Sequence, residues 1–193
     1  MTWSLEFRLH PLVLVNVSDH HARCLLNQAG GGSRVIGCLL GEQKGRVIHV
    51  TNTFEMIFTD EHEQGVDMEH LRVKKDQYKK VFPDLEVIGW YSTGSKILDK
   101  DSQIHEIVGE FNESPVLLLL DPTISEEHKD LPVALYETEM HVVDGVPSQT
   151  FVQTKYAVDS SEAERIAVNQ VARILPSGKA SCSEQLTSHM TGM

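Results

Sequence analysis

The stretch EVIGWYSTGS, residues 86–95, decides the fold because it joins a hydrophobic strand to a polar turn. Its apolar β-forming residues lead to the aromatic pair Trp90 and Tyr91, and residues 92–95 are expected to form a bend. In α/β proteins, functional side chains gather where strands end. The bend therefore indicates a reaction site, either working or abandoned.

The elements around this stretch mix helices with hairpins. Apolar periodicity predicts helices over residues 11–26, over 69–82, from about 101 onward, and over 160–174, the last capped by Asp159 with Glu162 three residues later. Alternation and turn residues predict strands at 5–10, 34–42, 46–58, 85–91 and 114–121, and a hairpin of 131–143 with 148–158. This order predicts an α/β sandwich with a mixed sheet rather than a doubly wound parallel sheet.

Composition limits the classes of function. The 193 residues carry a net charge of -11, which repels nucleic-acid phosphates, so we expect no nucleic-acid partner. Neither a membrane helix nor a secretory leader is expected, since the apolar runs are short and the first ten residues lack a basic-then-apolar pattern. Three widely spaced cysteines fit the cytoplasm and nucleus better than an oxidising compartment.

A metal hydrolase is the enzymatic alternative at the bend. Such a site needs about three His or carboxylate ligands and a general base. The spacing of Asp99, Asp101 and His105 could supply them, but two helix-capping aspartates and a histidine on the helix face explain the same residues. Of the other histidines, His49 lies in a predicted strand, and no ligand partner in the sequence is found for His10, His128, His141 and His189.

Four longer stretches together resemble one family, the MPN domain: HPLVLVNVSDH, RVIGCLLGEQKGRVIHVTNTFEM, VIGWYSTG and SSEAERIAVNQVAR, in order from about residue 7 to residue 175. The resemblance implies a central mixed, curved sheet flanked by helices. It also implies an MPN domain over residues 5–175 and a polar tail over 176–193, expected to be the truncated start of a C-terminal helical region.

Active members of that family, the JAMM metalloproteases, remove ubiquitin or ubiquitin-like modifiers with a bound metal. Laid on this chain, their two metal histidines fall at Ser92 and Gly94, the metal aspartate at His105 and the catalytic glutamate at Arg34, while a family serine is kept as Ser102. The resemblance therefore implies no catalytic residues, no metal and no cofactor. A guanidinium at position 34 cannot accept a proton and repels a divalent ion.

Inactive MPN domains of this kind pair with an active JAMM subunit in the proteasome lid, the COP9 signalosome and translation initiation factor three. The stretches GWYSTG, KDLPVALYETEMHVVDG and EAERIAVNQVAR most resemble the signalosome branch, which acts on cullins and would connect this chain indirectly to cullin ligases. The resemblance thus implies a scaffold subunit with other signalosome subunits as partners. The isolated domain could also pair with itself.

The predicted helices over residues 11–26 and 160–174 carry apolar stripes that could bind such a partner. One stripe of each helix could face away from the sheet. The alternative interpretation is that both stripes are buried within the domain. A third class, an independent binder of ubiquitin-like proteins, requires an exposed apolar patch that the sequence does not locate. The predicted partner-binding residues are Val13, Val17, Ala167, Val168, Val171 and Leu175.

Overall fold

The computed structural model describes residues 5–27, 34–57, 65–123, 132–143 and 146–159. These residues belong to one compact unit that ends at Asp159. No helix in the described ranges has the length and apolar character needed to span a bilayer. The elements are, in order, β1 (Glu6–Leu9), α1 (Pro11–Asn27), β2 (Ile36–Lys44), β3 (Val47–Glu55), α2 (Met68–Val81), β4 (Glu86–Thr93), α3 (Asp101–Gly109), β5 (Val116–Leu120), β6 (Val133–Val143), β7 (Val146–Thr154) and β8 (Tyr156–Val158).

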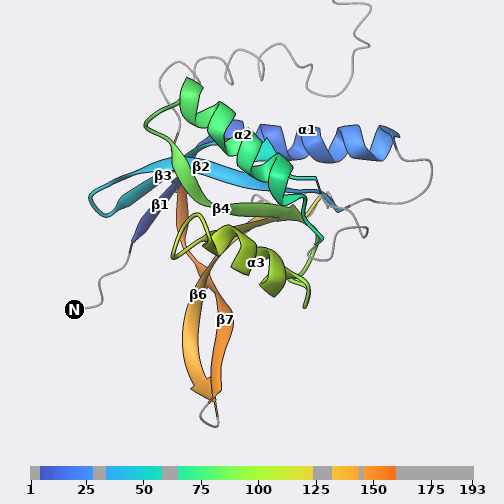
Figure 1. Ribbon diagram of the computed structural model, residues 1–193. Helices are drawn as coiled ribbons and strands as arrows, with labels where there is room; N and C mark the ends of the chain where they lie inside the picture. Colours follow the sequence, from blue (N-terminus) through green and yellow to red (C-terminus); the bar gives the residue numbers. More distant parts are fainter. Residues whose placement is uncertain (1–4, 28–33, 58–64, 124–131, 144–145, 160–193) are drawn as a thin grey trace, which may run out of the picture. The chain divides into compact units, whose positions relative to one another are not determined.

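The strands form one sheet in the order β7-β6-β5-β4-β2-β3-β1-β8. The β4–β5, β1–β3 and β1–β8 pairs are parallel, and the other neighbours are antiparallel. The predicted mixed sheet is therefore confirmed. Helices α1 and α3 lie on opposite sides of it (Figure 1).

The alternation of β4 divides its side chains between two cores. Tyr91 belongs to the core under α1, together with Val13 and Val17. Trp90 belongs to the core under α2 and α3, together with Leu71 and Ile104. Both rings are at most 1% exposed, so the aromatic pair packs the central strand against helices on both faces of the sheet.

Two glycines let other groups approach the centre of the sheet closely. A Cβ at Gly89 would come within 2.0 Å of the carbonyl oxygen of Val116, so any side chain there would disturb the β4–β5 pairing. A Cβ at Gly37 would come within 2.4 Å of the Tyr91 ring. Gly37 therefore leaves the space in which Tyr91 packs.

The helices predicted over 11–26, over 69–82 and from 101 are confirmed within one or two residues.

Two other expectations are wrong. Ser92 and Thr93 belong to strand β4, so the bend begins at Gly94. The second strand of the hairpin is split, because β7 pairs with β6 whereas β8 pairs with β1. The helix expected over 160–174 and the boundary expected at 175 lie outside the described residues.

Candidate functional site

Arg34, Ser92 and Asp101 meet where β2 begins, β4 ends and α3 begins. Arg34 Nε donates to Ser92 Oγ at 2.6 Å, and Arg34 Nη2 is paired with Asp101 Oδ1. The other oxygen of Asp101 accepts the backbone N–H of Leu98 at 2.8 Å. Because Asp101 and Ser92 are completely buried while the Arg34 side chain is 23% exposed, a cation belonging to the protein lies over two buried polar groups.

The bend beside this cluster is held by hydrogen bonds that backbone N–H groups donate. Thr93 N–H donates to Val35 O at 3.2 Å, Val35 N–H donates to Thr93 Oγ1 at 3.0 Å, and Gly94 N–H donates to Leu120 O at 2.9 Å. Gly94 has φ of 150°, a conformation that residues with a side chain rarely adopt. The backbone at this position thus suits glycine and disfavours a ligand-bearing residue.

His105 is a buried packing residue of α3. The indole N–H of Trp90 donates to His105 Nδ1 at 3.1 Å, and the distance from His105 Nε2 to Thr138 Oγ1 is 3.2 Å. Since an indole can only donate, Nδ1 must be an acceptor and the ring is neutral, with its proton on Nε2 directed to Thr138. Burial lowers the pKa of His105 to about 4, in agreement with the neutral form.

The proposed grouping of Asp99, Asp101 and His105 around one ion is therefore wrong. The carboxylate of Asp101 is taken by Arg34 and Leu98, and both ring nitrogens of His105 are engaged elsewhere. The capping interpretation also needs correction, because Lys100 occupies the N-cap of α3 and Asp101 lies in its first turn. The retained Ser102 is exposed on that turn.

A cavity of about 350 Å³ opens beside this cluster. Arg34 and Lys96 both line it, so two cations would repel a divalent ion in this space, whereas Ser92 and His105 do not line it. At about 4 Å and an effective dielectric of about 20, each like-charge contact costs about 4 kcal/mol per pair of unit charges. Its remaining lining residues are His21, Thr93, Gly94, Ser95, Leu98 and Pro122.

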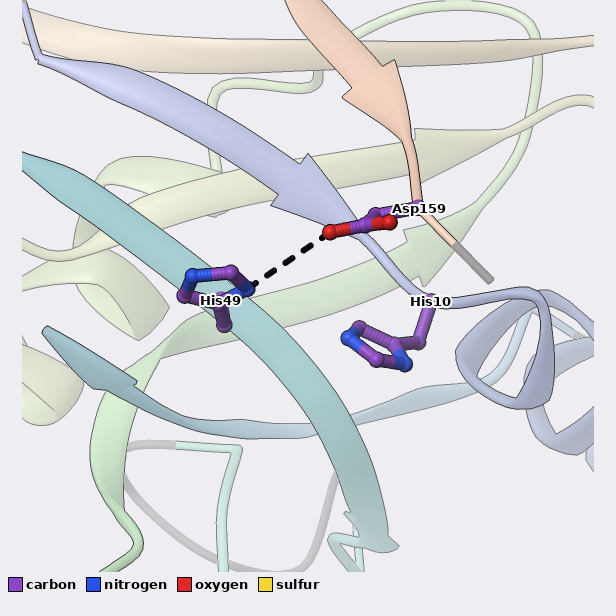
Figure 2. Close-up of side chains that lie close together, drawn as sticks. All are labelled: His10, His49 and Asp159. Atoms are coloured by element: carbon purple, nitrogen blue, oxygen red, sulfur yellow. Dashed lines mark ion pairs between the residues drawn. The ribbon is translucent and has the colours of Figure 1, made fainter. Parts of the chain in front are cut away.

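Another set of titratable side chains gathers away from this cavity. His10, His49 and Asp159 bring three potential ligand atoms within 4.8 Å of one another, the one such group in the described part of the chain (Figure 2). Sequence spacing could not reveal it, because the three residues come from separate segments.

Comparison with known proteins agrees with this architecture. The family model described as JAB1/Mov34/MPN/PAD-1 ubiquitin protease matches residues 3–114, which is more than half of the chain. The chain belongs to this family. The MPN assignment made from four sequence stretches is thereby confirmed.

Comparison with individual proteins shows which named members of the family this chain resembles. The chain is 47% identical over 98% of its length to COP9 signalosome complex subunit 6 of Oryza sativa subsp. japonica, covering 61% of that protein. It is 43% identical to subunit 6a of Arabidopsis thaliana and 45% identical to subunit 6 of Dictyostelium discoideum, over 98% of this chain in each case. It spans 65% and 60% of those two relatives, respectively.

The zinc of active JAMM members does not fit the corresponding residues of this MPN domain. A hydrolytic zinc takes three His, carboxylate or Cys ligands and leaves a position for water. Here the four aligned positions carry a guanidinium, a hydroxyl, a glycine without a side chain, and an imidazole whose lone pair accepts the Trp90 N–H. The donors needed to bind the ion are therefore not present at these positions.

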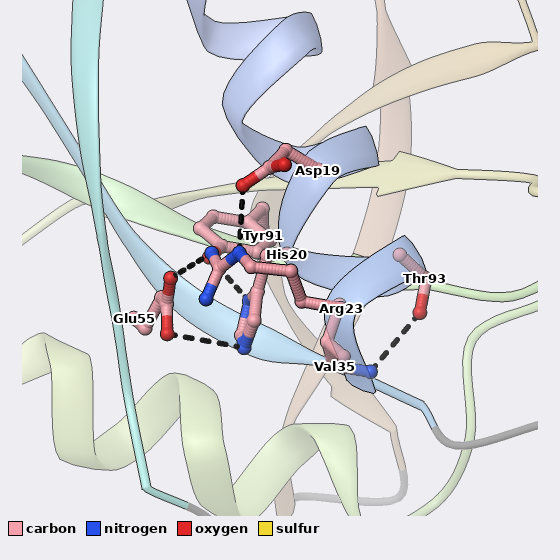
Figure 3. Close-up of polar contacts among 7 residues, drawn as sticks. All are labelled: Asp19, His20, Arg23, Val35, Glu55, Tyr91 and Thr93. Atoms are coloured by element: carbon pink, nitrogen blue, oxygen red, sulfur yellow. Dashed lines mark hydrogen bonds and ion pairs between the residues drawn. The ribbon is translucent and has the colours of Figure 1, made fainter. Parts of the chain in front are cut away.

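This MPN domain has a second polar cluster, which the sequence did not predict. His20 Nδ1 and Tyr91 Oη are 2.9 Å apart, and His20 Nε2 lies 3.6 Å from Glu55, which also binds Arg23 (Figure 3). Burial lowers the pKa of His20 and raises that of Tyr91. A neutral His20 that directs Nε2–H towards Glu55 accepts a hydrogen bond from the Tyr91 hydroxyl at Nδ1, and this bond links α1 to β4.

The predicted partner-binding residues of α1 require a correction. Val13 and Val17 are completely buried in the core of the MPN domain, so they cannot offer a surface to a partner. The exposed apolar residues of this helix are instead Leu12, Val15, Leu25 and Leu26, at 46%, 61%, 43% and 87% exposure. The other predicted contacts, Ala167, Val168, Val171 and Leu175, lie outside the described residues.

Proposed function

We propose that the chain is a non-catalytic scaffold subunit of a COP9 signalosome. In this function it pairs with the active JAMM subunit that removes a ubiquitin-like modifier from cullins. The pairing of Arg34 with Asp101 and Ser92 carries the non-catalytic part of the proposal. Metal-assisted hydrolysis needs a general base and an ion that activates water, and a guanidinium supplies neither.

The signalosome part of the proposal is supported by the relatives. Three proteins from a grass, a crucifer and a slime mould, each named as signalosome subunit 6 or 6a, are 43–47% identical over nearly the whole chain. Because the chain spans less than two thirds of each of them, contacts made by the rest of those proteins are not attributed to it.

The exposed face of α1 is the partner surface that we propose within the described residues. At 100° per residue, Leu12, Val15 and Leu26 fall within an arc of about 60° around the helix axis, and all three are exposed. The exposed carboxylate of Asp19 lies within the same arc. Val13 and Val17 point to the opposite side and fill the core. A face that combines exposed apolar side chains with a charged one suits a surface that another protein covers.

Co-expression with an active JAMM subunit of a signalosome, followed by mass measurement in solution, tests the proposal. We expect one copy of each chain in the complex. A chain that remains monomeric, or that forms only homodimers in the presence of excess partner, would contradict the scaffold function.

A further inference from the structure

We propose that His10, His49 and Asp159 bind a divalent transition-metal ion of the zinc type at the sheet edge formed by β1, β3 and β8. This site is separate from the Arg34 cavity, with which it shares no lining residue. All three residues are partly buried, and their ligand atoms lie within 4.8 Å of one another (Figure 2).

The backbone of the sheet places the three ligands. His10 N–H donates to Val50 O at 2.9 Å, and Asp159 N–H donates to Leu9 O at 3.1 Å. His49 precedes Val50 on β3, where it lies opposite Arg8 of β1. The side chains thus leave three adjoining segments whose positions are fixed by hydrogen bonds, which is the preorganised support that a metal site requires.

The donor set selects the class of metal. Two imidazole nitrogens and one carboxylate oxygen suit zinc, cobalt or nickel, whereas calcium and magnesium favour oxygen-only sites. Zinc bonds of about 2.0–2.2 Å to nitrogen and oxygen place tetrahedral donors roughly 3.3–3.5 Å apart. The three donors, now within 4.8 Å of one another, would have to move closer by side-chain rotation to reach that geometry. Water would complete the coordination.

Arg8 is the competitor of the ion at this site. Its Nη1 donates to Asp159 Oδ2 at 3.2 Å, and His49 Nδ1 lies 4.0 Å from the same oxygen. Arg8 also pairs with Glu6, so its charge is shared. A cation next to the carboxylate weakens metal binding by repulsion, and its removal should strengthen binding. A cluster that is only a network of ion pairs would not show this response.

Titration of the metal-free chain with Co²⁺, and with Zn²⁺ in competition with a chelating dye, tests the site. We expect one equivalent to bind, with a Co²⁺ absorption spectrum typical of nitrogen and oxygen ligands. His49→Asn and Asp159→Asn should each lower the affinity at least tenfold, and Arg8→Gln should raise it. The matched control is His141→Asn, because His141 is an exposed histidine beside a carboxylate, Glu139, at 3.3 Å.

A second measurement does not depend on variants that could fail to fold. In histidine-selective nuclear magnetic resonance spectra of the wild-type chain, Zn²⁺ should shift the ring signals of His10 and His49 and leave those of His20 and His105 in place. Equal affinity in the wild type, His49→Asn and Asp159→Asn, or metal-induced shifts confined to other histidines, would overturn the proposal.

Discussion

At position 34 a guanidinium lies where the resemblance to active JAMM members predicts a carboxylate. Its charge is balanced by Asp101, which is completely buried. A buried ion pair is weak evidence of net stabilisation, but removing one partner leaves an unpaired charge in the interior. The pair therefore makes the start of α3 depend on Arg34 for its stability.

Arg34→Met tests this dependence, since it keeps most of the side-chain volume and removes the charge. We expect the free energy of unfolding to fall by about 3–5 kcal/mol, measured by chemical denaturation. Arg34→Met combined with Asp101→Asn should recover part of the loss. Arg23→Met is the control, because Arg23 pairs with two carboxylates, Asp19 and Glu55, but is 49% exposed, so its replacement should cost much less stability. Equal losses for the two arginines would show that Asp101 does not need its partner.

His105 makes stability depend on pH. Its pKa is lowered by burial to about 4 in the folded chain, against 6.5 for the unperturbed group. Between those values the unfolded chain binds a proton that the folded chain does not, so the free energy of unfolding should fall as the pH decreases from about 6.5 to about 4. At about 1.4 kcal/mol per pKa unit, the contribution of His105 reaches about 3 kcal/mol.

Denaturation of the wild type and His105→Asn at several pH values isolates this contribution from that of His20, whose pKa is also lowered. The variant should lose less stability than the wild type on acidification. Parallel pH profiles would mean that His105 is protonated in the folded chain, in conflict with the hydrogen bond that it accepts from Trp90.

Helix α1 has one face that packs in the core and one that we propose as the partner surface. Val13→Glu would bury a carboxylate in the core and should prevent folding or cost more than about 3 kcal/mol. Val15→Glu, two residues further along, changes a side chain that is 61% exposed and should alter stability by about 0.5 kcal/mol or less. Circular dichroism and denaturation distinguish the two variants.

The same pair of variants tests the partner surface. If α1 binds the active JAMM subunit, Val15→Glu should fold normally and weaken the complex at least tenfold in a binding titration. A folded Val15→Glu chain that binds as tightly as the wild type would exclude the exposed face of α1 as the interface.

The elements themselves were largely predictable because each rests on local periodicity. The apolar spacing of residues 11–26 and 69–82 and the alternation in 85–91 gave the correct element types. The separation of β8 from β7 was missed, since it depends on the pairing of Tyr156 with Phe7 across most of the chain. Periodicity also could not show that the first-half apolar residues of α1 divide between core and surface.

At the scale of the whole molecule, the assignment of Arg34, Ser92 and His105 to the positions of a JAMM site rests on the family motifs and stays a prediction. The structure added what those residues do: Arg34 binds Asp101, and His105 accepts from Trp90. Neither this pairing nor the meeting of His10 with His49 and Asp159 has a sequence signature, because the tertiary fold brings distant segments together.

The most direct measurement is cleavage of an isopeptide-linked ubiquitin-like modifier by the purified chain alone, with added zinc and again after chelation. The chain should be assayed as wild type and as Asp159→Asn, so that an ion at the sheet edge is not mistaken for a catalytic one. We expect no more cleavage in any of these samples than in buffer without the protein. Cleavage that survives Asp159→Asn and stops on chelation would contradict this expectation.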